Sequence, residues 1–109
     1  MSTKLTHKLT VFIPKNVQRG GVVTACVNLS KLCKGMTAMD GSGFWYDGTG
    51  KGYQDKLVLA TWWYTADKES DVLALSGHLY DAMFKYGEMC VMAEKYTPQL
   101  GLRAHLFYP

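Results

Sequence analysis

The chain has 109 residues, of which 48% are hydrophobic and 19% are charged, and its net charge is +3. This length and composition predict one globular domain over residues 1–109 and exclude a disordered chain. The basic residues are scattered singly and form no dense patch, which argues against nucleic acid as a partner.

The sequence also indicates the cellular compartment of the protein. No apolar stretch approaches the roughly 20 residues that a membrane-spanning helix needs, and the amino terminus lacks the pattern of a signal peptide. The three cysteines are an odd number and include no Cys-x-x-Cys pair, so they are expected to be reduced thiols. We therefore expect a cytoplasmic protein with no membrane contact.

The first half of the chain predicts a strand, a helix and an extended segment. Residues 4–13 alternate between apolar and polar side chains, which is typical of a strand. Apolar residues then recur at spacings of four, three and four from Val22 to Cys33. This spacing predicts a helix, and Gly35 suits its end. Residues 36–47 look extended.

The next elements are a second strand pattern and a second helix. Residues 53–65 are apolar on both faces after Lys56, which predicts a strand in the middle of a sheet. Helix-start signals lie at residues 67–71, and Gly87 closes the helix that follows. Gly77 lies inside this helix, where glycine is unfavourable, so we expect another segment to pack closely against it.

Two short strands complete the chain. Residues 89–93 predict a buried strand, and residues 102–108 alternate and predict the last strand. The order is β-α-β-β-α-β with an extra strand at the C-terminus. It predicts an α+β fold of the ferredoxin-like, split βαβ kind, with an antiparallel sheet and two helices on one face.

A glycine-rich run, Gly41 to Lys56, lies between the two central strand patterns. A phosphate-binding loop needs Gly-Lys followed by Ser or Thr, and then a helix. Here Gly52 follows Lys51, and the next segment is a strand. The run from Asp47 to Gly52 is therefore predicted to connect a β-hairpin.

Aromatic residues are concentrated on this hairpin. A central strand that is apolar on both faces must bury its second face, and a chain of this length has no second layer to cover it. We therefore expect a homo-oligomer, a dimer or a trimer. The aromatics either serve only the core and the interface or also line a ligand pocket between subunits. They are Phe44, Trp45, Tyr46, Tyr53, Trp62, Trp63 and Tyr64.

Asp55 precedes the apolar part of the central strand, between Gln54 and Lys56. Two interpretations remain open for its carboxylate. It is either solvated and paired with Lys56, or it lies at the rim of an aromatic pocket where it attracts a cation.

The sequence predicts no metal and no cofactor. The histidines His7, His78 and His105 lack metal-ligand spacing, so structural roles are favoured for them. Cys26 and Cys90 fall in segments expected to be buried, where thiols are inert.

Three segments resemble the small bacteriophage S-adenosylmethionine lyases, which disarm host restriction by destroying its cofactor. The matching segments are Trp45-Tyr46, residues 54–58 and residues 86–95, within a loose likeness over residues 36–95. Where that family tends to carry Glu, this chain has Asp55.

The resemblance implies an activity and a set of site residues. In the lyase reaction the substrate's own carboxylate attacks its Cγ and expels methylthioadenosine, which leaves homoserine lactone. It implies Asp55 as the catalytic residue, substrate binding by Trp45, Tyr46, Tyr53 and Gln54, and action in the host cytoplasm if a phage encodes the chain. The alternative is a non-catalytic anti-defence protein that binds a small ligand or inhibits a host protein.

Overall fold

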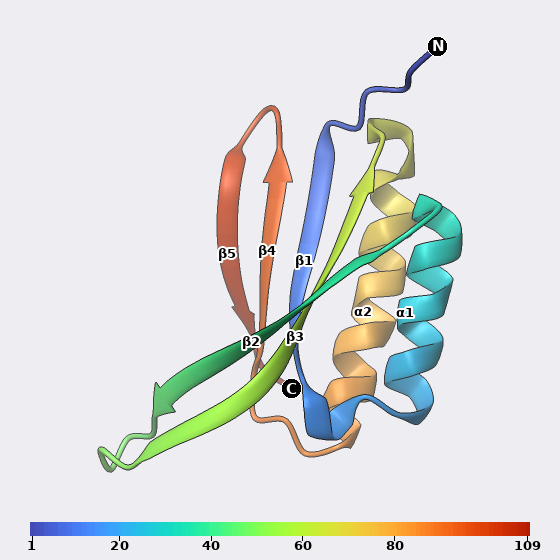
Figure 1. Ribbon diagram of the computed structural model, residues 1–109. Helices are drawn as coiled ribbons and strands as arrows, with labels where there is room; N and C mark the ends of the chain where they lie inside the picture. Colours follow the sequence, from blue (N-terminus) through green and yellow to red (C-terminus); the bar gives the residue numbers. More distant parts are fainter.

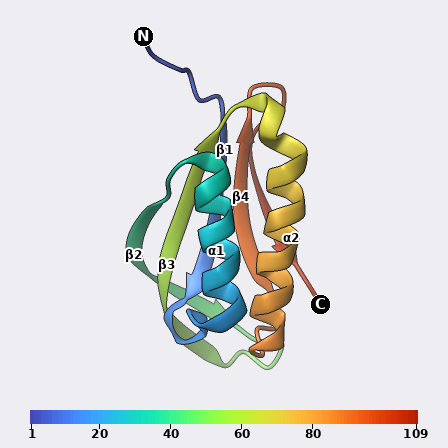
Figure 2. The same cartoon turned by 90° about the vertical axis from the view of Figure 1, so that its right-hand side faces the viewer.

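Five strands form one antiparallel sheet with the order β2-β3-β1-β4-β5. The computed structural model describes residues 1–109, and both helices cover the same face of the sheet (Figures 1 and 2). The elements are β1 (His7–Pro14), α1 (Gly20–Cys33), β2 (Thr37–Tyr46), β3 (Gly52–Tyr64), α2 (Glu69–Lys85), β4 (Val91–Thr97) and β5 (Gly101–Phe107). The predicted ferredoxin-like α+β fold is confirmed, with β5 added at one edge.

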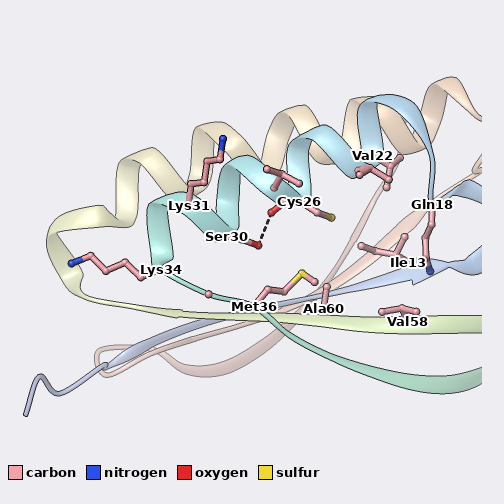
Figure 3. Close-up of a pocket in the computed structure, with 13 residues that line it drawn as sticks. Ile13, Gln18, Val22, Cys26, Ser30, Lys31, Lys34, Met36, Val58 and Ala60 are labelled. Atoms are coloured by element: carbon pink, nitrogen blue, oxygen red, sulfur yellow. Dashed lines mark hydrogen bonds between the residues drawn. The ribbon is translucent and has the colours of Figure 1, made fainter.

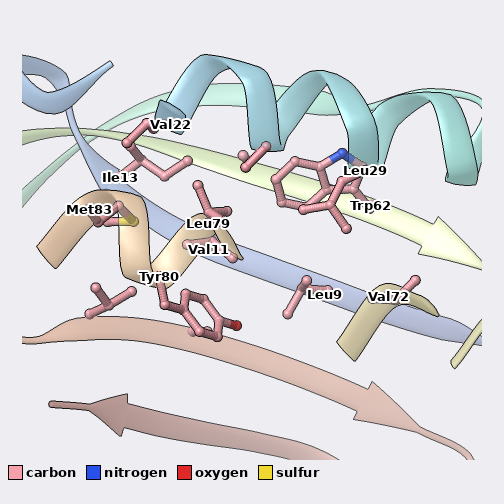
Figure 4. Close-up of a cluster of buried hydrophobic side chains, with 14 of the residues drawn as sticks. Leu9, Val11, Ile13, Val22, Leu29, Trp62, Val72, Leu79, Tyr80 and Met83 are labelled. Atoms are coloured by element: carbon pink, nitrogen blue, oxygen red, sulfur yellow. The ribbon is translucent and has the colours of Figure 1, made fainter. Parts of the chain in front are cut away.

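The core lies between the helices and one face of the two central strands. Strand β1 pairs with β3 so that Leu9 faces Trp62 and Val11 faces Ala60. These four side chains are buried, and Figure 4 shows Leu9, Val11 and Trp62 beneath the helices. The indole Nε1 of Trp62 donates a hydrogen bond to Ser30 Oγ at 3.0 Å, so the largest core residue leaves no polar atom unpaired.

The helix ends follow the glycine signals. Lys34 ends α1 with a φ of 63°, and Gly35 N donates to Ser30 O at 2.8 Å. Gly87, with a φ of 93°, donates to Phe84 O just after α2. Gly77 differs from expectation, because a Cβ added there would meet no atom within 4 Å. The expected close packing at Gly77 is therefore wrong.

Strand β4 lies later in the chain than the sequence indicates. It begins at Val91 and continues to Thr97, because Tyr96 pairs with Lys8 of β1. Cys90 thus lies before the strand and is exposed, so the expectation of a buried thiol there is wrong. Cys26 is half-buried, and burial raises the pKa of its thiol to about 11. No helix has the length and hydrophobicity to cross a bilayer.

The sheet face away from the helices is covered by no other layer of the chain (Figure 1). We call it the open face. Several of its apolar side chains are exposed: Met39, Trp45, Tyr53, Trp63, Met92, Tyr96, Leu102 and Leu106.

Candidate functional site

The β2–β3 hairpin extends beyond the other strands and ends in a loop that Asp47 organises (Figure 1). Asp47 Oδ1 accepts hydrogen bonds from the Thr49 hydroxyl at 2.5 Å, Thr49 N at 2.9 Å and Lys51 N at 3.1 Å. These bonds, chiefly that from the Thr49 hydroxyl, lower the pKa of Asp47. Gly50 supplies a φ of +86°. The run is the connection of a hairpin, as predicted.

A stacked aromatic pair lies next to this loop and holds Asp55. The register places Trp45 opposite Tyr53 and Gly43 opposite Asp55, so all four lie on the open face. The rings of Trp45 and Tyr53 stack with centroids 4.4 Å apart and an interplanar angle of 14°. Trp45 Nε1 donates to Asp55 Oδ2 at 3.1 Å, and the Tyr53 hydroxyl donates to Asp47 Oδ2 at 3.2 Å.

The structure places the other expected site residues elsewhere. Tyr46 and Gln54 register on the opposite face of the hairpin from Asp55. The Tyr46 ring lies over Gly52, where an added Cβ would be 2.8 Å from a ring carbon. Lys56 also points to that opposite face, and Asp55 forms no ion pair with it. Adjacent strand residues alternate in direction, so the Asp55–Lys56 pairing considered from the sequence does not occur.

Glu88 is a second acid at this site that the sequence did not single out. It lies in the connection between α2 and β4 and is half-buried. Burial, together with the charge of Asp55, raises the pKa of Glu88. Asp55 and Glu88 therefore repel one another electrostatically, although they lie far apart in the sequence. The only signal in the sequence was the position of Glu88 within the segment that resembles the lyases.

This arrangement suits a positively charged ligand. A carboxylate at the edge of an aromatic pair, with the charge of Glu88 acting on it, attracts a cation by charge and by the negative faces of the rings. Trp45 is 39% exposed and Tyr53 is 36% exposed, so the pair is accessible in the single chain. Lys51 Nζ lies 5.2 Å from the Tyr53 ring centroid, so the ring already contacts one cation.

A separate hollow of about 530 Å³ lies between α1 and β3, and Gln18 is its one polar lining residue besides Ser30, Lys31 and Lys34. Its walls are mostly apolar, and Lys31 and Lys34 point away from it (Figure 3). Ser30 is already engaged, since its hydroxyl donates to Cys26 O at 2.7 Å. A pocket without convergent polar groups does not orient a reacting ligand.

The histidines lie outside any cluster of possible metal ligands. No group of three or more His, Cys, Asp or Glu side chains could hold a metal ion. His7 is buried, and its Nδ1 lies 2.8 Å from the Thr6 hydroxyl. Its ring is tilted relative to that of Tyr64, and the two ring centroids are 5.5 Å apart. These contacts are those of a structural residue.

The fold places the chain among ferredoxin-like α+β domains, and two solved structures share it over nearly their whole length. One is a phage SAM lyase in complex with S-methyl-5'-thioadenosine, with a TM-score of 0.65 and 10% sequence identity. The other is a phage SAM lyase in the apo state, with a TM-score of 0.62 and 8% identity. In both cases the match covers 100% of this chain and 96% of the other. No family model matches the sequence, and no curated protein matches it. The resemblance to the phage lyases is thus present in the fold.

Proposed function

We propose that this chain is an S-adenosylmethionine lyase of the phage type, with its site on the open face of the β2–β3 hairpin. The proposal rests on the hydrogen bond by which Trp45 holds Asp55 at the edge of a stacked aromatic pair. The charge of Asp55 also acts on a second carboxylate, Glu88. The shared fold supports the same assignment.

The charges of the site match those of the substrate. S-adenosylmethionine carries an ammonium and a sulfonium, and the site offers two carboxylates, Asp55 and Glu88. Its adenine is a flat ring, which the Trp45–Tyr53 pair can receive by stacking. Asp55 would hold one cationic group, and its bond to Trp45 fixes the orientation of the carboxylate.

The reaction needs no nucleophile from the protein. A carboxylate oxygen of the substrate forms a bond to Cγ, and the bond from Cγ to the sulfonium breaks. The electron pair of that bond passes to sulfur, giving neutral methylthioadenosine and homoserine lactone. The carboxylate and the sulfonium both lose their charge, so a site with little water favours the transition state. The protein's contribution is to hold the reacting carboxylate behind Cγ.

A single chain leaves this site open to solvent. Asp55 is half-buried, and the two stacked rings are more than a third exposed. A second copy placed on the open face would exclude water from the same region. We therefore include a homo-oligomer, a dimer or a trimer, in the proposal.

The biological setting follows from the reaction. Removal of S-adenosylmethionine would deprive restriction enzymes that depend on it, so the protein would counter restriction in the cytoplasm of a host cell. Tyr46 and Gln54 lie away from Asp55 within one chain, so any part they play would be in contacts with a neighbouring subunit.

The test is incubation of the purified protein with S-adenosylmethionine, followed by mass spectrometry. Methylthioadenosine and homoserine lactone should form in equal amounts without added metal or cofactor. Binding of S-adenosylmethionine without either product would instead indicate the alternative, a non-catalytic anti-defence protein. Absence of both binding and turnover would reject the site.

A further inference from the structure

A second hollow, of about 400 Å³, lies between α2 and the helix-facing side of β4 and β5. It is separate from Asp55, which lies on the open face at the other end of the sheet order. Its lining combines apolar side chains with cationic ones. Gly77, Tyr80, Lys95, Arg103, His105 and Phe107 are among its lining residues, and Glu69 lies next to it as the partner of Lys95.

Two cations, Lys95 and Arg103, line this hollow, and only Lys95 is paired with a carboxylate. The register of β4 and β5 places Lys95 directly opposite Arg103, and like charges in this position repel. Glu69 forms an ion pair with Lys95 and also accepts a hydrogen bond from the Tyr64 hydroxyl at 2.8 Å. Burial and the charge of Arg103 lower the pKa of Lys95 despite that ion pair. One positive charge is therefore uncompensated.

Arg103 is the cation that lacks a partner. Its Nε is buried and makes no hydrogen bond, and its guanidinium forms no ion pair. A buried donor is usually satisfied, so an unpaired one marks a place where a partner is missing. His105 registers opposite Ala93 on the same face and adds an exposed imidazole to this wall.

The apolar part of the hollow is flat and has free space. Tyr80 and Phe107 stack with centroids 4.6 Å apart and an interplanar angle of 19°. Tyr80 points from α2 toward the strands (Figure 4). At Gly77, on the same helix, an added Cβ would meet no atom within 4 Å, so the hollow is unobstructed there.

We propose that this hollow binds a small oxyanion, a carboxylate or a phosphate, attached to a flat apolar body. The oxyanion would pair with the guanidinium of Arg103, which suits planar, bidentate recognition. The apolar body would lie against Phe107 beneath Gly77. This proposal does not depend on lyase activity.

The experiment is calorimetric titration of the purified protein with benzoate, inorganic phosphate and benzylamine. Benzoate should bind, benzylamine should not, and phosphate should bind more weakly than benzoate because it lacks the apolar body. R103Q should weaken benzoate binding about tenfold to a hundredfold, the loss expected for one charge-assisted hydrogen bond. R19Q removes the chain's other arginine charge, and should leave the affinity unchanged. G77L should fill the hollow and abolish binding while the protein stays folded.

Amide NMR shifts keep the proposal testable if a variant fails to fold. Benzoate added to the wild-type protein should shift the amides of Gly77, Arg103 and His105. Shifts confined to the β2–β3 hairpin, no binding of benzoate, or equal affinity in R103Q would each overturn the proposal. Phosphate binding as tight as benzoate would overturn its apolar part.

Discussion

Asp55 is the residue whose charge the proposed site uses most directly. Asp55→Asn keeps the size of the side chain and its bond to Trp45 but removes the charge. A hydrogen bond to a charged group contributes roughly 1.5–3 kcal/mol, so release of methylthioadenosine should fall about tenfold to a hundredfold. Asp55→Glu keeps the negative charge, and should be tolerated far better than Asn.

The matched control for Asp55 is Asp40→Asn. Asp40 lies on the same strand pair, is largely exposed and pairs with Lys15 at 3.1 Å. An exposed pair of this kind contributes under about 1 kcal/mol, so the Asp40 variant should keep its activity. Equal rates in the wild type, Asp55→Asn and Asp55→Glu, with unchanged melting temperatures, would remove Asp55 from the site.

Glu88 predicts a particular dependence of stability on pH. Because its pKa is raised above the ordinary 4.5 in the folded state, the folded protein holds this proton more tightly than the unfolded chain. Its contribution is present below pH 4.5 and is lost as the pH rises through the folded pKa. Urea unfolding at several pH values should show the free energy of unfolding of the wild type falling over this window relative to Glu88→Gln.

The same linkage connects Glu88 to ligand binding. A cation bound beside Asp55 and Glu88 favours the ionised carboxylate, so binding should release a proton and strengthen as the pH rises. The control is Glu94→Gln, because Glu94 lies on β4, the strand that follows Glu88. If Glu88→Gln and Glu94→Gln have the same pH profile as the wild type, Glu88 does not share a site with Asp55.

At the scale of elements, the hairpin loop depends on one acid and not on its lysine. Asp47 accepts four hydrogen bonds, including that from the Tyr53 hydroxyl, so Asp47→Ala should disorder the loop and loosen the aromatic pair. Lys51 offers an exposed contact with the Tyr53 ring, worth about 0.5–1 kcal/mol, so Lys51→Ala should change activity less than about fivefold.

Rates of methylthioadenosine release, compared with near-ultraviolet circular dichroism of the tyrosine and tryptophan rings, separate these two effects. Asp47→Ala should reduce both signals, whereas Lys51→Ala should preserve both. A large loss of activity in a well-folded Lys51→Ala protein would mean that the loop contacts an anionic group of the ligand.

The order of elements could be predicted from the sequence because alternation and helical spacing are local signals. The run through Leu9 and Val11 fixes which face of β1 is buried, and the structure agrees. The start of β4 could not be predicted, since Met89 and Cys90 are apolar but the strand begins only at Val91, where pairing with Phe107 of β5 begins. Local patterns do not contain that partner.

The site was predictable only in part, for the same reason. Trp45, Tyr53 and Asp55 were expected together, and the register joins them. Tyr46 and Gln54 were grouped with them by sequence position, although alternation turns adjacent residues to opposite faces. Glu88 reaches Asp55 through the tertiary fold alone, so no spacing in the sequence could assign it a role.

At the scale of the whole molecule, the open face predicts self-association. Trp62 and Trp63 are adjacent in β3, and their side chains lie on opposite faces of the sheet. Trp62 is fully buried under the helices, whereas Trp63 is 42% exposed on the open face. Trp62→Lys should therefore unfold the chain, because it buries an unpaired charge and leaves a cavity. Trp63→Lys should leave the chain folded and dissociate the oligomer.

Light scattering and circular dichroism of the wild type and two variants test this assignment. The wild type at micromolar concentration should scatter as a multiple of the 12.2 kDa chain, and Trp63→Lys should scatter as one chain with its helical signal intact. Val23→Lys is the control, since Val23 is 46% exposed on α1, away from the open face, and the oligomer should persist. A wild-type mass near 12.2 kDa at all concentrations would show that no second copy covers the open face. Water would then have to be excluded from Asp55 by the substrate itself. If the wild type is an oligomer, its dissociation by Trp63→Lys together with loss of methylthioadenosine release would indicate a site completed by the neighbouring subunit.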